Sequence, residues 1–413
     1  MIGVLVLIFI TPILVFAQVP ARELVVDQRG ALTTLGAALA IARDGDRIVV
    51  RPGIYREPTI VVSQRVTISA DSGVVLDGED KRAIMIVAAD DVTVRGFTFR
   101  RTGTSHLEDR AALLLREVRN CVIADNILSE TYFGIYLQRV RDCEVTGNRL
   151  TGLNRNGSSG GNGIHVWQSD SVRISGNTIR AHRDGIYFEF VKHGDVRLNL
   201  SELNQRYGLH FMFSDDCSYL GNTFQRNASG VAVMYTRRVR MAGNTFAHNW
   251  GSAAYGLLLK EISDSEIHDN RFTENTVGLY LEGANRNLVS DNRFEANGWA
   301  LRLLANSQEN RVTGNAFAGN SFDVGTNSRQ NFSTFSGNVW DRYRGYDLDR
   351  DGFGDVPFAP VRLFSLVVEQ TPPALILIRS FIVDLLDFAE RVMPMLTPQT
   401  LIDEKPRMSL AIR

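Results

Sequence analysis

The 413-residue sequence contains only three cysteines, and its formal net charge at pH 7 is −1. Three cysteines do not build the disulfide framework of a small secreted domain. A charge so close to zero argues against nucleic acid as the main partner. The chain also lacks a nucleophile elbow, a P-loop and a Ser–His–Asp spacing, so no common catalytic motif stands out. Its length suits one long solenoid with end caps.

The first 17 residues are apolar and end in Val15-Phe16-Ala17. This pattern predicts a signal peptide, residues 1–17, with cleavage after Ala17. The segment has no Lys or Arg before its apolar run, and the alternative is an uncleaved membrane anchor. Both interpretations place the bulk of the chain outside the cytoplasm.

A repeat of about 22 residues fills most of the chain. Each copy reads Gly-apolar-x-apolar, a polar run, then apolar-x-apolar and a corner asparagine, as in residues 208–222. Apolar residues alternate with period two inside each copy, which excludes coiled-coil heptads. The repeat predicts an all-β chain, a right-handed parallel β-helix over residues 48–340, with two short strands per coil. The corner asparagines follow one another at steps of 22, 29, 22, 23, 22, 26, 22, 23 and 23 residues: Asn126, Asn148, Asn177, Asn199, Asn222, Asn244, Asn270, Asn292, Asn315 and Asn338.

The two corners of each coil have different expected roles. Glycine removes the Cβ at one sharp corner. Asparagine at the other corner tolerates left-handed backbone and bonds to its equivalent on the next coil as a ladder. Stacked coils about 4.8 Å apart then close a continuous core that no single coil builds alone.

Segments outside the repeat are expected to cap the solenoid. Residues 18–47 form the N-terminal cap, with a short amphipathic helix over residues 32–42 that covers the first coil. Three insertions, near His106, before Gly163 and before Gly256, leave from the same corner of the coil, and such insertions cluster on binding faces.

The three cysteines each sit five residues before a corner asparagine, in a slot that valine fills in other copies: Cys121, Cys143 and Cys217. This slot faces inward, so the thiols are expected to pack in the core. A disulfide between Cys121 and Cys143 on adjacent coils is the alternative in an oxidising compartment.

The repeat ends at Trp340 and gives way to an acidic loop region over residues 341–371. An amphipathic helix over residues 372–396 follows, and residues 397–413 form a tail. The charged residues of this helix argue against a membrane span, and its apolar face favours docking into a partner's groove. The alternative is a cap on the last coil. The apolar residues expected to dock are Leu375, Ile378, Phe381, Ile382, Leu385, Leu386, Phe388 and Met393.

Strand alternation assigns two outward columns to the strand that follows each corner glycine. The first column contains Tyr136, His165, Tyr187, His210 and Ala232, and the second contains Gln138, Trp167, Glu189, Met212, Met234 and Lys260. Imidazole beside thioether is a soft donor set suited to Cu(I), which makes His165, His210, Met212 and Met234 candidate copper ligands. Ordinary packing under a loop is the alternative. Met85 is expected to point outward as well, and Met241 inward.

The acidic loop follows the first nine positions of an EF-hand-type calcium loop, although Phe358 stands where the last glutamate belongs. A solvated acidic turn is the alternative. The candidate calcium ligands are Asp347, Asp349, Asp351 and Asp355.

Solenoids of this kind also occur in polysaccharide lyases and epimerases, and the fold alone does not decide between these functions. The residues available for such chemistry are Tyr187, Glu189, Lys192 and His210. A pure scaffold that never binds a metal is a third alternative.

Five stretches resemble the NosD family: residues 162–177, 184–199, 207–217, 230–244 and 340–358. The resemblance extends over nearly the whole chain. It implies a periplasmic, non-enzymatic protein of nitrous-oxide reductase maturation, associated with the inner membrane through a transporter. The implied partners are the membrane subunit NosY with its ATPase NosF, the copper donor NosL and the apo-reductase. The implied cargo is copper, and the C-terminal helix looks like the element that docks on the transporter.

Overall fold

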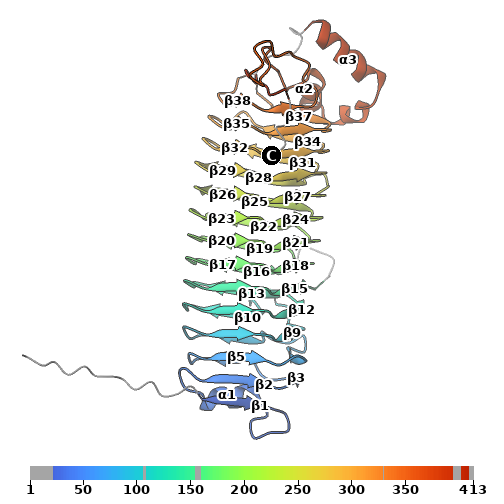
Figure 1. The fold of residues 1–413 in the computed structure, drawn as a ribbon. Helices are drawn as coiled ribbons and strands as arrows, with labels where there is room; N and C mark the ends of the chain where they lie inside the picture. Colours follow the sequence, from blue (N-terminus) through green and yellow to red (C-terminus); the bar gives the residue numbers. More distant parts are fainter. Residues whose placement is uncertain (1–21, 106–107, 154–159, 329, 394–400, 409–413) are drawn as a thin grey trace, which may run out of the picture.

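The computed structural model describes residues 22–105, 108–153, 160–328, 330–393 and 401–408. The chain winds into a straight column of coils with α1 at one end and α2 and α3 at the other (Figure 1). Three parallel sheets run along this column. The structure therefore confirms the all-β parallel β-helix and corrects the number of strands per coil from two to three. The predicted signal peptide, residues 1–17, lies outside the described residues.

Each sheet takes one strand from each successive coil, and neighbouring strands pair in register. Sheet A consists of β1 (Glu23–Val26), β2 (Arg47–Val50), β5 (Thr67–Ala70), β8 (Thr93–Arg95), β11 (Val122–Ala124), β14 (Glu144–Thr146), β17 (Arg173–Ser175), β20 (Asp195–Arg197), β23 (Ser218–Leu220), β26 (Arg240–Ala242), β29 (Glu266–His268), β32 (Leu288–Ser290), β35 (Arg311–Thr313) and β38 (Thr334–Ser336). Sheet B consists of β3 (Gly53–Tyr55), β6 (Val74–Asp77), β9 (Thr98–Arg100), β12 (Ile127–Thr131), β15 (Arg149–Gly152), β18 (Thr178–Arg180), β21 (Leu200–Glu202), β24 (Thr223–Gln225), β27 (Thr245–Ala247), β30 (Arg271–Thr273), β33 (Arg293–Glu295), β36 (Ala316–Ala318) and β39 (Val339–Trp340). Sheet C consists of β4 (Ile60–Val62), β7 (Met85–Val87), β10 (Ala111–Arg116), β13 (Phe133–Gln138), β16 (Ile164–Trp167), β19 (Ile186–Glu189), β22 (Tyr207–Met212), β25 (Ser229–Arg237), β28 (Tyr255–Ser263), β31 (Val277–Glu282), β34 (Trp299–Leu303) and β37 (Phe322–Gly325).

The corner asparagines form the expected ladder. Asn222 is buried, and its Nδ2 and backbone N–H both donate to Oδ1 of Asn244, at 3.0 and 2.9 Å. The expected left-handed conformation lies one residue earlier, however, as at Leu198 (φ 53°) and Gly221 (φ 63°). The asparagine itself is the hydrogen-bonding group, and the preceding residue makes the turn.

A second asparagine ladder lies at the corner between sheets B and C. Asn204 Nδ2 donates to Asn227 Oδ1 at 2.9 Å, and the pattern continues through Asn249. His182 occupies the position one coil before Asn204, and its backbone N–H donates to Asn204 Oδ1 at 3.1 Å. His182 is therefore the first member of this ladder.

Inward side chains form the core. Phenylalanines on successive sheet B strands stack with ring centroids 4.7 Å apart at Phe246–Phe272 and Phe272–Phe294. The three cysteines are buried with free thiols, and the Cys121 N–H donates to Cys143 Sγ at 3.4 Å. Met241 points inward as expected.

Met85, expected on the outer face, is wrongly placed by the sequence interpretation. It is fully buried and pairs with Leu113, which belongs to the core. The prediction failed because this early coil lacks the corner glycine from which the faces were counted.

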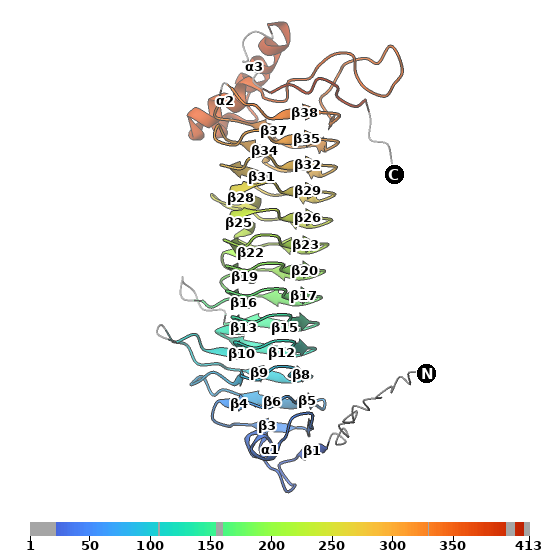
Figure 2. The ribbon, with the colours of Figure 1, turned by 90° about the vertical axis from the view of Figure 1, so that its left-hand side faces the viewer.

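The N-terminal end carries helix α1 (Leu35–Ile41), shorter than the predicted 32–42, beneath the first coils (Figures 1 and 2). Thr34 caps the helix, and its side chain accepts from Ala37 N–H at 3.1 Å. Strand β1 pairs with β2, so sheet A begins inside the segment predicted as a cap, residues 18–47.

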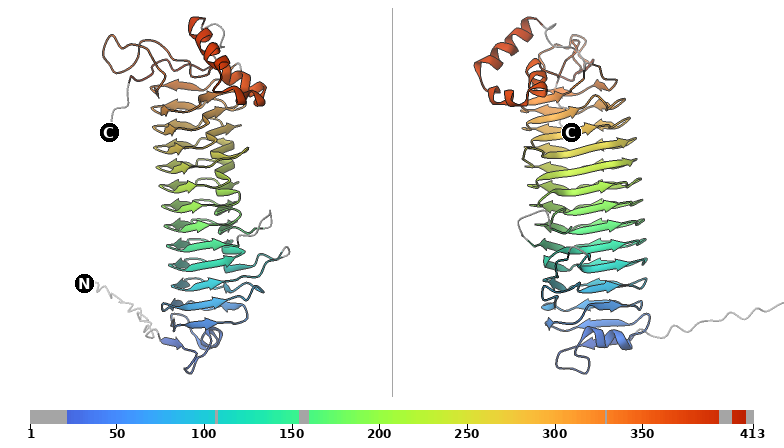
Figure 3. Two further views of the ribbon diagram at one scale, coloured as in Figure 1. Left: turned by 90° about the vertical axis from the view of Figure 1, so that its right-hand side faces the viewer. Right: turned by 180° about the vertical axis from the view of Figure 1, so that it is seen from behind.

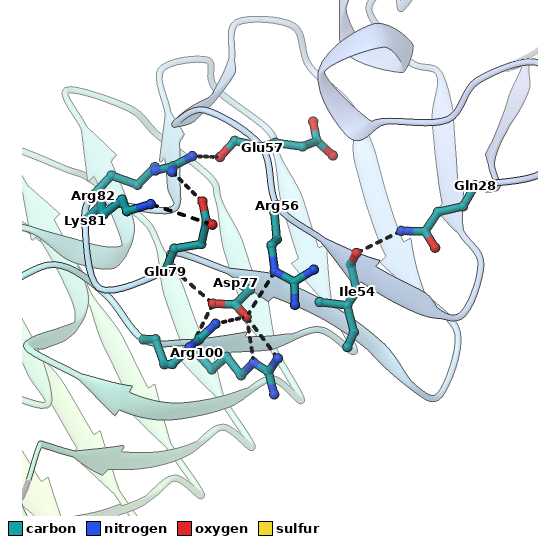
Figure 4. A network of polar contacts seen from close by, with 10 residues as sticks. Gln28, Ile54, Arg56, Glu57, Asp77, Glu79, Lys81, Arg82 and Arg100 are labelled. Atoms are coloured by element: carbon teal, nitrogen blue, oxygen red, sulfur yellow. Dashed lines mark hydrogen bonds and ion pairs between the residues drawn. The ribbon is translucent and has the colours of Figure 1, made fainter.

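A buried carboxylate ties the first coils together (Figure 4). Asp77 has no exposed side-chain surface, and it pairs with Arg100, Arg101 and Arg56. Burial alone would raise the pKa of Asp77, but the arginine hydrogen bonds outweigh it and lower the pKa to about 2. These ion pairs link Asp77, the last residue of β6, to Arg100 and Arg101 at the end of β9 on the next coil.

The C-terminal helical region differs from the prediction. The expected helix over residues 372–396 is a 3₁₀ turn, η1 (Pro372–Leu377), followed by α3 (Phe381–Val392). An unpredicted helix, α2 (Leu363–Gln370), lies in the segment expected to be a loop, residues 341–371. Arg302 anchors α2 to the solenoid through two bonds to Glu369, at 2.9 and 2.7 Å.

The predicted tail, residues 397–413, contains a returning segment over its described residues 401–408. Asp403 is buried and accepts from Asn338 Nδ2 at 2.9 Å and from Trp340 Nε1 at 3.0 Å. It thereby takes the position of the next asparagine and closes the ladder. Within the described residues, no helix is long and apolar enough to cross a membrane.

The three insertions leave from the corner between sheets B and C, as expected. The described residues of the first insertion, 101–105 and 108–110, project to one side of the column (Figure 3, left). The outer face of sheet C lies beside them.

Candidate functional site

The outer face of sheet C places the predicted soft donors in two columns. In the first, Tyr136 pairs with His165, His165 with Tyr187, and Tyr187 with His210. In the second, Glu189 pairs with Met212, Met212 with Met234, and Met234 with Lys260. Met212 and Met234 are thus direct neighbours on adjacent coils, one sheet spacing of about 4.8 Å apart.

The two candidate histidines are not direct neighbours. Tyr187 lies between them, with ring centroids 4.8 Å from His165 and 4.9 Å from His210. Two rungs of a sheet separate strands by about 9.5 Å. One ion therefore does not contact both rings in this arrangement, and the donors divide into His165 on one side and a group of His210, Met212 and Met234 on the other.

His165 is enclosed by aromatic rings. Its ring stacks on Tyr136 at 4.5 Å, and both ring nitrogens are buried without a hydrogen-bond partner. Burial and the nearby Arg183 lower the pKa of His165 to about 3. The imidazole therefore stays neutral at physiological pH, which is the state that binds metals.

His210 is buried beside a charged pair. Its Nδ1 lies 3.2 Å from Arg206 Nη2 and 3.5 Å from Asp184 Oδ2, while Nε2 is buried and has no partner. Burial alone would raise the pKa of Asp184, but the hydrogen bonds from Arg206 and His210 outweigh it and the pKa is lowered. The unpartnered Nε2 is the atom available to a ligand.

The two methionines are half-buried, and Tyr187 donates its hydroxyl hydrogen to Met212 Sδ at 3.6 Å. Thioether sulfur and neutral imidazole nitrogen are donors that select Cu(I) over harder cations. Because His210 Nε2 lacks any partner, the residues present fit a soft monovalent cation. Packing by the insertion before Gly163 remains the competing explanation for the methionines, and residues 154–159 lie outside the described part of the chain.

The enzyme-like group predicted from the sequence is only partly assembled. Tyr187 and His210 are neighbours, but Lys192 is exposed on a bridge after β19, where it pairs with Asp170. Burial raises the pKa of Tyr187 to about 12, so its phenol stays protonated and does not serve as a base at neutral pH. This geometry does not favour lyase or epimerase chemistry.

The acidic loop brings three of its four predicted ligands together. Oxygens of Asp347, Asp349 and Asp351 all lie within 4.8 Å of one another. Asp355 instead accepts from Leu348 N–H at 2.7 Å and braces the loop. Calcium coordination by carboxylate oxygens suits this arrangement.

Helix α3 turns its apolar side outward. Two of its acidic residues face α2: Asp387 pairs with Arg362, and Glu390 accepts from Leu363 N–H at 3.3 Å. Six of the eight predicted docking residues are exposed: Leu375, Phe381, Ile382, Leu385, Phe388 and Met393.

Two predicted docking residues, Ile378 and Leu386, are not exposed in this way. They pack in a cluster with Val383 of α3 and Trp299 of β34, at the end of the solenoid. The sequence interpretation missed Ile376, which is 89% exposed and lies beside the other exposed apolar residues of this region. We call Leu375, Ile376, Phe381, Ile382, Leu385, Phe388, Val392 and Met393 the outward patch.

Sequence reasoning missed Asp184, Arg206 and His182. His182 stands 22 residues before Asn204, and Asn227 and Asn249 continue at steps of 23 and 22, so this second periodicity was available as a signal. Asp184 and Arg206 are likewise one repeat step of 22 residues apart, so their contact on adjacent coils was also available as a signal. The repeat step does not show that His210 lies beside them, because that depends on how the corner between sheets B and C folds.

The profile of the family described as "Periplasmic copper-binding protein (NosD)" matches residues 155–345. A "Probable ABC transporter binding protein NosD" of Stutzerimonas stutzeri is 27% identical over 90% of this chain and 89% of its own length. Its namesake in Pseudomonas aeruginosa PAO1 is 28% identical over 94% of this chain and 97% of its own length.

Among solved structures, the surface adhesin PfbA of Streptococcus pneumoniae superimposes with a TM-score of 0.56 at 11% identity, over 71% of this chain and 85% of its own. That likeness concerns the fold alone. The family match extends over all four candidate copper ligands, and the two full-length relatives share its name. The chain is thus similar to the NosD family over residues 155–345 and to two NosD relatives over 90% or more of its length.

Proposed function

We propose that this protein is a periplasmic copper-handling subunit of an ABC transporter complex that supplies copper to nitrous-oxide reductase. The observation that carries the proposal is the group of His210, Met212 and Met234 on the outer face of sheet C, with a buried and unpartnered imidazole nitrogen. This group lies inside the region that matches a copper-binding family.

In this proposal copper is cargo. His210 Nε2 and the sulfurs of Met212 and Met234 hold Cu(I), and His165 serves as a separate donor two rungs away. The copper donor NosL and the apo-reductase are the partners on either side of the transfer. A binding role agrees with the names of the relatives, which describe transporter binding proteins.

The copper proposal is tested with a double substitution, Met212→Leu and Met234→Leu, in the full chain. Leucine keeps the volume and removes the thioether donors, so Cu(I) affinity measured against a competing chelator should fall by about 100-fold or more. Met241→Leu, a buried core methionine, is the matched control. An affinity unchanged by the double substitution would overturn the copper site.

We also propose that the outward patch docks on the transporter's membrane subunit, NosY, which works with the ATPase NosF. An apolar helix face of this kind suits a hydrophobic groove of a protein partner. The helix carries acidic residues, which disfavour adsorption to an anionic lipid surface. This contact would hold the protein at the inner membrane.

A further inference from the structure

A fixed carboxylate lies behind the candidate copper ligand His210. The Asp184 side chain has no exposed surface, and Arg206 on the next coil donates to both of its oxygens, with Nε 2.8 Å from Oδ1. The Tyr207 N–H donates to the same Oδ1 at 3.2 Å. These donors leave the carboxylate little freedom to move.

The His210 ring is equally confined. The rings of Tyr187 and Tyr207 each lie 4.9 Å from it, centroid to centroid. Its Nδ1 lies between two groups that require opposite tautomers: Asp184 Oδ2 accepts a proton, and the Arg206 guanidinium only donates one. In the neutral imidazole, the position of the proton decides whether Nε2 carries a lone pair.

Two physical arguments favour the proton on Nδ1. A buried N–H without an acceptor is among the rarest defects in proteins, and Nε2 has no partner here. Histidine ligands also characteristically donate their other N–H to a carboxylate, which orients the ring and makes the ligating nitrogen more basic.

We propose that Asp184 is the positioning residue that holds His210 as the Nδ1–H tautomer, so that Nε2 points its lone pair at a soft cation, and that Arg206 fixes Asp184 for this role. The inference rests on the proposed copper function of His210. Neither the family match nor the relatives assign a role to Asp184.

The first experiment is a double-substitution cycle with Cu(I) delivered from its complex with a chelator. Asp184→Asn keeps an oxygen for Tyr207 and Arg206 but removes the charge, and we expect about 10- to 100-fold weaker binding. His210→Ala should weaken binding at least as much, and adding Asp184→Asn to it should cause no further loss. Asp170→Asn, which perturbs the exposed pair of Asp170 and His193 Nδ1 at 2.8 Å, is the control.

The outcomes separate the two claims. If His210→Ala leaves the affinity unchanged, the proposed copper function of this residue fails. If His210→Ala weakens binding and Asp184→Asn does not, the positioning role alone is wrong. If Asp184→Asn lowers the Cu(I) affinity by the same factor in the wild-type chain and in His210→Ala, Asp184 does not act through His210, and the positioning role is wrong.

The second experiment needs no variant at Asp184 and therefore survives any folding defect. Long-range proton–nitrogen NMR of the histidine-labelled full chain identifies the protonated nitrogen of His210, assigned by its absence in His210→Ala. We expect Nδ1–H in the copper-free protein and the same after Cu(I) is added. A proton on Nε2 in both states would overturn the proposal.

Discussion

Single residues at fixed positions of each coil provide the side-chain hydrogen bonds between adjacent coils. The side chain of a ladder asparagine such as Asn244 accepts from a backbone N–H of the preceding coil and donates to a backbone carbonyl of that coil and to the next asparagine. Few other side chains do both. His182 is the exception in the second ladder. It is 2% exposed, and burial lowers its pKa to about 4.

This histidine predicts a stability that depends on pH. The unfolded chain, with an ordinary pKa of about 6.5, takes up the proton first as pH falls, so stability present above about pH 6.5 is lost progressively down to about pH 4. The loss amounts to at most about 3 kcal/mol. Comparing thermal unfolding near pH 7.5 and pH 5 measures it.

His182→Asn should remove the share of this pH dependence that belongs to His182, because asparagine extends the ladder toward Asn204 and does not titrate. The share of His165, whose pKa is lowered to about 3, should stay. His193→Asn, at an exposed position, is the control. An unchanged difference between the two pH values in His182→Asn would show that other groups cause the loss.

At the residue scale, the sequence predicted the columns because alternation and the 22-residue step fix which side chains share a face. It did not predict that Tyr187 separates His165 from His210 as a spacer, since a list of column members says nothing about which of them one ion reaches. The 22-residue step pairs Asp184 with Arg206, but it does not place His210 beside them, because that contact depends on the course of the corner between sheets B and C.

Elements at the C-terminal end show how the solenoid terminates. The ladder needs an acceptor after Asn338, and Asp403 supplies it from a segment 65 residues further along the chain. Asp403→Ala would leave the Asn338 backbone N–H and Trp340 Nε1 buried without these acceptors, while Asn338 Nδ2 keeps its bond to the Val312 carbonyl. We expect a loss of about 3 kcal/mol in the free energy of unfolding, measured by denaturant titration.

The neighbouring Glu404 is exposed and has no such partners, so Glu404→Ala is the matched control. Equal stability of the two variants would mean that the returning segment does not contribute to the end cap. The same geometry explains why truncation before Ala374 is a poor test of docking: it removes Asp403 as well as the outward patch.

The acidic loop with Asp347, Asp349 and Asp351 is a candidate calcium site at the same end of the solenoid. We expect Ca²⁺ at about ten times its dissociation constant to raise the free energy of unfolding of this end by about 1.4 kcal/mol. Thermal unfolding with calcium and with a chelator measures the shift. Asp349→Asn combined with Asp351→Asn should abolish it, whereas Asp384→Asn on α3 should not, and a shift that persists would place calcium elsewhere.

Helix α3 illustrates where amphipathic analysis succeeds and fails. The arc of charged residues correctly predicted a two-sided helix. In the structure, Asp387 and Glu390 face the N-terminus of α2, and the apolar side of α3 faces out. Sequence alone did not show this, because α2 was not predicted and its N-terminus provides the partners.

Across the whole molecule, the outward patch at the solenoid end is separate from the candidate copper ligands His210, Met212 and Met234 at mid-height. Phe381→Ser, Leu385→Ser and Phe388→Ser together should abolish binding to the detergent-solubilised membrane subunit while changing solenoid stability by less than about 0.5 kcal/mol per site. Co-purification and thermal unfolding check the two parts.

Phe332→Ser provides the control for this test, since Phe332 is 73% exposed but lies outside the patch. Retained binding in the triple variant would contradict docking through α3. Cu(I) affinity should stay unchanged in both variants, because Met234 on β25 lies four strand steps of sheet C from β37, at the end that carries the patch.

The column of coils also determines reach. Four strand steps of sheet C separate Met234 on β25 from β37 beneath α2, which corresponds to about 19 Å of height. If α3 docks on the transporter, the candidate copper ligands lie at a distance from the docked end that is set by the number of coils between them. Inserting or deleting one 22-residue repeat between them would shift that distance by a single increment of about 4.8 Å without altering either end.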